Sequence, residues 1–218
     1  ELLGSKYRMP LEPLLQLEQP MQALVFRQWL RGQEIPTLSE VRIYEFLNQL
    51  ADSNETSQAE VRWNQWQLKR YRNFIWLQDL STLAACPGQS WDEGMKLELG
   101  AGLGHLQLRG EAVSIPPAWN VDSRREGGKI RLWEKGHRQT LKEMFRLSGI
   151  PPWMRAAIPV LYWDGKPAAI GDWIITQKMN SWLDSKHLEY RWYPADPVLL
   201  ELQSSCHEST VDPSQPLG

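Results

Sequence analysis

The spacing of apolar residues changes from a helical to a strand period after Leu50. Ile43, Phe46 and Leu50 lie at i, i+3 and i+7, which places them on one face of an α-helix. Beyond this point, residues 61–77 are rich in β-branched and aromatic side chains on both sides of a short polar break. The succession predicts a helical bundle that is finished by a small antiparallel hairpin.

Proline and glycine indicate where the helices of this first part begin and end. Residues 11–19 carry leucines among Glu and Gln in a short helix-like pattern. Pro20 suits the N-terminus of a second helix and Gly32 suits its C-terminal end. A third helix is expected to begin near Ser39.

The second half of the chain predicts a mixed α/β arrangement of short strands around one or two helices, within an overall α+β fold. Asp164-Gly165 readily adopts positive φ, so residues 160–170 are expected to form a hairpin. A helix is expected from Arg138 to Ser148, closed by Gly149. Further strands are expected at residues 130–133, 173–175 and 190–193, with short strands and turns at 97–108.

The length of 218 residues favours two compact units. A stretch of Ser, Pro, Gly and Asp between them is typical of a linker. The last residues are rich in Ser, Pro and Asp, which is typical of a mobile tail. The expected division is 1–80 for a helical domain, 81–94 for the linker, 95–203 for a C-terminal α/β domain and 204–218 for the tail.

Membrane and secreted proteins do not fit the sequence. No apolar run approaches the roughly 20 residues that span a bilayer, and no basic-then-apolar leader is present. Because the chain begins with Glu1 and not Met, we expect a fragment or a processed product. Cys86 and Cys206 lie far apart and are expected to be unpaired thiols in a reducing cytoplasm.

The chain carries no recognisable catalytic motif. Its four histidines never occur at metal-ligand spacing with one another, so no metal site is expected. The glycine run at residues 100–104 lacks the spacing, the preceding strand and the following helix of a dinucleotide loop. A turn between strands explains it. The chain alone is therefore expected to be non-catalytic and to hold no cofactor.

The net charge of −2 hides a local excess of cations. Residues 120–192 hold thirteen Lys and Arg against eight Asp and Glu, whereas residues 193–218 hold four acids and no Lys or Arg. This balance disfavours a protein that coats nucleic acid indiscriminately, but it is compatible with a local basic face.

On the helix expected over 138–148, Arg138, Lys142 and Arg146 lie at i, i+4 and i+8 and would form one row. A row of cations on a packed helix can neutralise several backbone phosphates. An ordinary solvated helix face explains the same pattern, and both interpretations stay open. The cations that precede this helix are Arg124, Arg125, Lys129, Arg131 and Lys135.

A second basic cluster lies in the first unit, on an expected strand. Strand alternation would put Lys69 and Tyr71 on one side and Arg70 and Arg72 on the other. The cations could face RNA or could protect a sheet edge from pairing. The twelve tryptophans raise a further alternative, a surface that stacks bases or sugars. Most of them, however, fall at positions that pattern as core.

These residues together resemble the part of tRNA(Ile)-lysidine synthase that follows its catalytic domain. The most specific match is the run Pro151-Pro152-Trp153-Met154-Arg155 with Pro159 and Leu161. Looser matches are Arg27–Arg31, Pro36, Leu68–Arg72 with Trp76, and Leu141–Phe145; together they cover most of residues 10–175.

The resemblance implies a role in recognising tRNA(Ile), for an enzyme that joins lysine to the wobble cytidine with ATP and magnesium. ATP would bind a catalytic domain that this chain lacks, and that domain is an expected partner. Homodimerisation stays open, and DNA and membranes are not expected partners. A generic RNA- or protein-interaction module and a tryptophan-rich carbohydrate-binding module are the alternatives. The expected RNA-binding residues are Arg124, Arg125, Lys129, Arg131, Arg138, Lys142, Arg146, Arg155, Lys69, Arg70 and Arg72.

Overall fold

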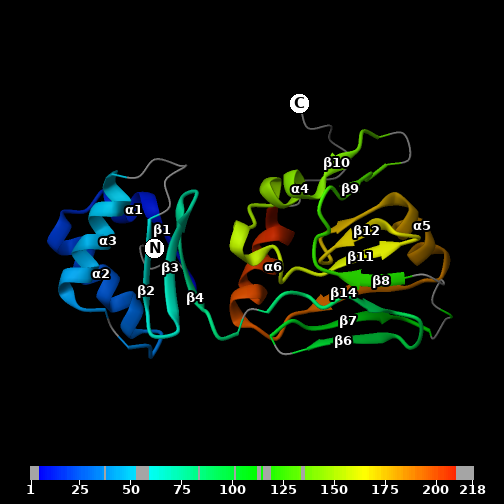
Figure 1. The fold of residues 1–218 in the computed structure, drawn as a ribbon, viewed down its shortest axis with the longest axis horizontal. Coiled ribbons are helices and arrows are strands. Elements are labelled where there is room, and N and C mark those ends of the chain that lie inside the picture. Colours follow the sequence, from blue (N-terminus) through cyan, green and yellow to red (C-terminus); the bar gives the residue numbers. More distant parts are fainter. Residues whose placement is uncertain are drawn as a thin grey trace. The chain divides into compact units, whose positions relative to one another are not determined.

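The chain divides into two compact units, Glu1–Ser81 and Thr82–Gly218 (Figure 1). Helices and antiparallel strands occur in both, which confirms the predicted α+β class. Among the residues described, no helix has the length and apolar character to cross a membrane. The structure, a computed structural model, describes residues 5–36, 38–52, 59–82, 84–100, 102–111, 114, 119–133 and 136–209.

In the first unit, helices cover one face of a four-stranded antiparallel sheet of order β1-β4-β3-β2 (Figure 1). The predicted helices and the hairpin are confirmed. Strand β1 was not predicted, because it pairs with β4 from far away in the sequence. The helices are α1 (Leu11–Leu15), α2 (Gln19–Arg31) and α3 (Glu40–Asp52), and the strands are β1 (Arg8–Pro10), β2 (Glu60–Trp63), β3 (Trp66–Tyr71) and β4 (Phe74–Asp79).

The core of the first unit is aromatic at its centre. The Phe26 ring lies 5.9 Å from the Trp29 ring and 5.8 Å from the Phe46 ring, measured between centroids. Leu68 and Ile75 of the sheet are completely buried in the same cluster. Burial of each such side chain contributes about 1.5–3 kcal/mol. The helices and the sheet of the first unit therefore stabilise each other.

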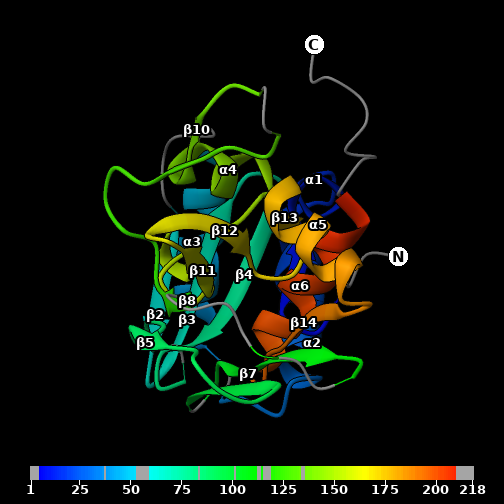
Figure 2. The same ribbon diagram turned by 90° about the vertical axis from the view of Figure 1, so that its right-hand side faces the viewer.

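The second unit contains two antiparallel sheets, of orders β13-β12-β11-β8-β5 and β14-β7-β6, and a two-stranded ribbon, β9–β10. Figures 1 and 2 both show the ribbon and α4 at one end of this unit and the β14-β7-β6 sheet at the other. The strands are β5 (Gln89–Ser90), β6 (Lys96–Gly100), β7 (Gly104–Arg109), β8 (Trp119–Asp122), β9 (Lys129–Ile130), β10 (Gln139–Thr140), β11 (Val160–Trp163), β12 (Lys166–Ile170), β13 (Ile174–Ile175) and β14 (Glu189–Tyr193). The helices are α4 (Leu141–Leu147), α5 (Gln177–Ser185) and α6 (Pro197–Ser209), with a 3-10 turn at Pro152–Met154.

Tryptophans build the core of the second unit. The ring of Trp119 makes edge-to-face contacts with Trp91, Trp163 and Trp182 at centroid distances of 5.7, 5.7 and 5.0 Å. Trp91 in turn lies 6.4 Å from Tyr190 of β14 and so connects the two sheets. Such aromatic pairs add about 0.5–1.5 kcal/mol each to the gain from burial.

The expected linker over 81–94 is partly built into the second unit. Trp91 is completely buried, and its backbone N–H donates to the Trp119 carbonyl at 3.0 Å. Cys86 is also buried, and its N–H donates to the Ala156 carbonyl at 2.8 Å. Because residues 81–94 are mostly polar in composition, the sequence did not indicate that Cys86 and Trp91 would be buried in the second unit.

The expected tail does not begin at Ser204, because α6 continues to Ser209. Leu199, Leu202 and Cys206 form a buried stripe on this helix, and Asp196 caps its start by accepting from the Val198 N–H at 2.8 Å. Residues 210–218 of the expected tail lie outside the described residues.

A buried carboxylate attaches α6 to the rest of the unit. Both oxygens of Asp172 accept from Gln203 Nε2 at 3.0 Å, and His207 Nε2 lies 3.0 Å from Oδ1. The backbone N–H of Trp192 in β14 donates to the same carboxylate at 3.3 Å. The Asp172 side chain is 1% exposed, so these partners replace the water that the charge has lost.

The glycine run forms the turn between β6 and β7, as expected. Gly100, Gly102 and Gly104 have φ of +94°, +79° and +69°. A Cβ on Gly104 would lie 1.8 Å from the carbonyl oxygen of Tyr193, so the close approach of β14 also requires glycine there. The run is not followed by a helix, and it lacks the geometry of a phosphate-binding loop.

One further expectation needs correction. Of the strand expected over 130–133, only Ile130 lies in a strand, β9, because residues 131–133 turn away from it.

Candidate nucleic-acid interface

The ribbon β9–β10 brings together basic residues from both sides of a loop. Ile130 pairs with Gln139 and Lys129 pairs with Thr140. The ribbon is tied to both neighbouring helices, since Leu141 N donates to the Gly128 carbonyl at 2.9 Å and Gln177 N donates to the Leu132 carbonyl at 2.8 Å. Its cations are therefore placed by backbone hydrogen bonds.

The predicted row of three cations on one helix is wrong. Thr140 is extended, and its Oγ1 accepts from the Glu143 N–H at 3.1 Å, which makes it the N-cap of α4. Arg138 therefore precedes the helix, and only Lys142 and Arg146 lie on it. The predicted docking face is confirmed, because the side chains of Leu141, Met144 and Phe145 are buried.

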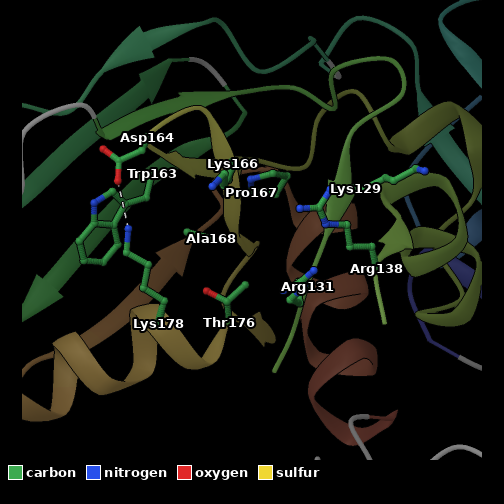
Figure 3. Close-up of a pocket in the computed structure, with 10 residues that line it drawn as sticks. All are labelled: Lys129, Arg131, Arg138, Trp163, Asp164, Lys166, Pro167, Ala168, Thr176 and Lys178. Atoms are coloured by element: carbon green, nitrogen blue, oxygen red, sulfur yellow. Dashed lines mark hydrogen bonds and ion pairs between the residues drawn. The ribbon is translucent and has the colours of Figure 1, made fainter. Parts of the chain in front are cut away.

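A recess of about 310 Å³ opens beside the ribbon (Figure 3). We call it the basic recess. Three parts of the unit form it: the ribbon and its flanks, the hairpin β11–β12, and the start of α5. Among the described residues that line it, Asp164 is the one carboxylate, against five cations. Its lining residues are Lys129, Arg131, Arg138, Trp163, Asp164, Lys166, Pro167, Ala168, Thr176 and Lys178.

One cation of the basic recess is already paired. Lys178 Nζ lies 3.0 Å from Asp164 Oδ2 and 4.0 Å from the centroid of the Trp163 ring (Figure 3). Trp163 is itself held edge-to-face by Trp119 and Trp182. The core tryptophans thus fix the position of the recess wall.

A second recess lies around the Gly127-Gly128 turn, lined also by Arg124, Arg125 and Lys142. Arg125 is engaged there, since its Nη2 donates to Asn120 Oδ1 at 2.7 Å and its guanidinium lies 4.3 Å from the centroid of the Tyr162 ring. Its Nε also lies 3.2 Å from Asp122 Oδ2.

Tyr162 supports the loop that carries Arg125. Burial raises the pKa of the Tyr162 hydroxyl, and a hydrogen bond from Arg125 offsets part of that rise. The neutral hydroxyl accepts from the Arg125 backbone N–H at 3.0 Å and donates to the Ser123 carbonyl at 3.3 Å. These contacts assign Arg125 a structural role beside any role in binding.

Two protein-family models match this chain. A model of the TilS substrate binding domain matches residues 9–76, and a model of the TilS substrate C-terminal domain matches residues 119–192. The chain belongs to the tRNA(Ile)-lysidine synthase family. The curated tRNA(Ile)-lysidine synthase of Xanthomonas campestris pv. campestris (strain 8004) is 29% identical over 200 residues, which are 89% of this chain and 45% of the relative. That of Escherichia coli O157:H7 is 26% identical over 172 residues, 76% of this chain and 39% of the relative. The chain thus spans less than half the length of these relatives.

All residues of the basic recess lie within the match to the C-terminal domain of the tRNA(Ile)-lysidine synthase family. The motif that carried the resemblance lies there too, but it has a packing role. Arg155 is half-buried, and its Nε donates to the Ile150 carbonyl at 3.1 Å. Arg146 is exposed on α4 and lines neither recess.

The basic cluster of the first unit lies within the other family match. We call Lys69, Arg70 and Arg72 the β3 cluster. Lys69 Nζ lies 2.8 Å from Glu60 Oε2, and its side chain is 14% exposed. Arg70 Nη1 donates to the Leu50 carbonyl of α3 at 3.5 Å. Arg72 has a φ of 54° and lies in the turn after β3, so the expected alternation ends before it.

The pKa of the Glu60 carboxyl reflects its contact with Lys69 of the β3 cluster. Burial raises the pKa of its carboxyl, but hydrogen bonds from Lys69, Arg62 and Gln67 and the charge of Lys69 outweigh this and lower the pKa. RNA binding by the β3 cluster stays a prediction; its protein contacts are a structural role.

Of the ten residues that line the basic recess, sequence reasoning predicted three as site residues and missed seven, among them Trp163, Lys166, Thr176 and Lys178. Lys166 directly follows the predicted Asp164-Gly165 turn. Its position at the end of a hairpin could have indicated an exposed cation that is available for binding. Lys178 belongs to α5, which was not predicted.

Among the described residues, no group of three His, Cys, Asp or Glu side chains is placed to hold a metal ion. Cys86 and Cys206 form no disulfide, as predicted, and both are buried. Burial, with the charge of Asp122, raises the pKa of the Cys86 thiol to about 12, so it stays protonated. Trp133, at 46%, is the most exposed tryptophan in the described part of the chain, which disfavours a carbohydrate-binding platform of several rings.

Proposed function

We propose that this chain is the tRNA-binding part of a tRNA(Ile)-lysidine synthase and that the basic recess contacts the tRNA backbone. The supporting observation is that a cation-lined hollow lies in the segment matched by a substrate-domain model of this family. Lysine and arginine side chains held by a rigid framework neutralise phosphates with little loss of side-chain freedom. The curated relatives carry the enzyme's name.

In this proposal the chemistry lies outside the chain. A catalytic domain would bind ATP and magnesium and join lysine to the wobble cytidine of tRNA(Ile), while this chain would hold the tRNA. The tRNA substrate also favours a cytoplasmic location. No residue of the basic recess is assigned a chemical step.

The test is tRNA binding by the full 218-residue chain at several salt concentrations. Because each neutralised phosphate contributes about −0.7 to −0.9 to the slope of log K against log salt, we expect a slope of about −3 to −5. We expect tRNA(Ile) to bind more tightly than other tRNAs and lysidine formation to return when a separate catalytic domain is added. Weak, salt-independent binding would contradict the proposal.

A further inference from the structure

The basic recess is small relative to a nucleic-acid duplex. Its volume of about 310 Å³ is that of a small-ligand pocket. It is bounded by the ribbon, by the hairpin β11–β12 and by the start of α5 (Figure 3). An internal phosphate of RNA would need an entry and an exit for the chain, whereas a terminal group needs one opening.

The charge of the basic recess exceeds what one internal phosphate offers. An internal phosphodiester carries a single negative charge, while a terminal phosphomonoester carries about −1.5 to −2 at neutral pH. Lys129, Arg138 and Lys166 line the recess in addition to the Lys178–Asp164 pair and Arg131. A doubly charged group with three acceptor oxygens matches such a concentration of donors.

A mostly buried threonine lines the basic recess. Thr176 is 6% exposed, and Figure 3 shows its side chain between Lys178 and Arg131. Within the described part of the chain its hydroxyl makes no hydrogen bond, so it is available to donate to a ligand in the recess. Thr176 also precedes α5, a nine-residue helix whose N-terminus favours an anion.

We propose that the basic recess binds the terminal 5′-phosphate of an RNA chain, with the Thr176 hydroxyl as a donor to it. Thr176 and Lys166 then distinguish an RNA end from the interior of an RNA strand. The inference rests on the proposed function, because it names which part of the tRNA enters this site.

The experiment compares tRNA(Ile) that carries a 5′-monophosphate with the same RNA carrying a 5′-hydroxyl. Dissociation constants are measured for the full 218-residue chain at one salt concentration. We expect the 5′-hydroxyl RNA to bind about tenfold more weakly, the loss of charge-assisted hydrogen bonds to one group. In Lys166→Ala and Thr176→Val this ratio falls towards one.

Lys142→Ala is the matched control, because Lys142 lines the second recess and not the basic recess. We expect it to weaken binding of both RNAs alike and to keep the tenfold ratio. Free GMP is added as a competitor. If GMP at the same concentration as the tRNA does not displace it, the result supports an RNA end as the ligand. If GMP competes as well as tRNA does, the ligand is a free nucleotide and the inference is overturned.

Equal affinity of the wild-type chain for the two RNAs also overturns the inference, and it leaves salt-dependent tRNA binding, and with it the proposed function, intact. The inference is also overturned if Lys166→Ala and Thr176→Val both keep the tenfold ratio between the dissociation constants of the two RNAs. The terminal phosphate would then bind at another site. If neither RNA binds, the proposed function fails too.

Discussion

The basic recess of the second unit and the β3 cluster of the first contain the same kinds of cation in different surroundings. In the β3 cluster, Lys69 is paired with Glu60, and Arg70 donates to the backbone of α3. In the basic recess, five cations surround a hollow with one carboxylate among its described lining residues. A basic stretch of sequence is therefore a candidate for phosphate binding only when the fold leaves a space in front of it.

The largest expected effect separates these two regions directly. In the chain with Lys129→Ala, Arg138→Ala and Lys166→Ala, we expect tRNA affinity to fall about 100-fold and the salt slope to become less steep, because three of the cations that neutralise phosphate in the basic recess are removed. Binding titrations at several salt concentrations measure both quantities.

The matched variant carries Lys69→Ala, Arg70→Ala and Arg72→Ala. It removes the same number of charges, but we expect less than about a threefold loss of affinity and a melting temperature lower by several degrees. Equal losses of affinity in the two triple variants would show that the β3 cluster binds RNA as strongly as the basic recess.

A smaller effect concerns the pH dependence of the first unit. The pKa of Glu60 is lowered in the folded chain, so its contribution to stability is present above its unfolded pKa of about 4.3 and is lost as the pH falls through the folded value. We expect Glu60→Gln to cost up to about 1 kcal/mol at pH 7 and less and less as the pH falls through the folded pKa of Glu60. Thermal unfolding of both chains over a series of pH values from 7 downwards measures the difference.

Glu40→Gln is the control for this prediction. Glu40 also forms an ion pair, at 3.0 Å from Arg27 Nη2, but its side chain is 65% exposed. Water screens such a pair, so we expect little change at pH 7. If Glu40→Gln lowers the free energy of unfolding as much as Glu60→Gln does, burial does not explain the contribution of the Glu60–Lys69 pair.

The smallest effect tests the one carboxylate among the described lining residues of the basic recess. Asp164→Asn keeps the shape of the turn and removes a charge that competes with phosphate for Lys178. We expect tRNA affinity to rise about threefold at low salt and the gain to shrink at high salt. Asp184→Asn, at the exposed end of α5, should leave affinity unchanged. A gain of the same size there would indicate a general effect of net charge.

Local signals in the sequence predicted the elements that depend on local conformation. Asp164 and Gly165 have φ of 51° and 71°, as the hairpin prediction required. The buried face of α3 followed from the spacing of its apolar residues. The start of α4 was missed, because Thr140 is a good N-cap inside what resembled a continuous helix.

Pairings between distant segments could not be predicted in the same way. The basic recess joins Lys129 to Lys166 and Lys178 across three elements, and no local pattern records that proximity. The row Arg138–Lys142–Arg146 was wrong for the same reason: periodicity describes a helix, but a cap and a strand pairing decide where the helix begins. Strand β1 also depends on a distant partner.

The family match ends at Trp192, but the fold continues through α6. A gene shortened to that boundary for protein engineering would remove Gln203 and His207, and with them two of the partners of Asp172. The same cut removes Leu199 and Leu202, whose buried side chains each contribute about 1.5–3 kcal/mol, and it exposes the apolar surface that they cover. Such a minimal domain would tend to aggregate, and the helix that the family comparison omits is therefore the one that a cloned second unit must retain.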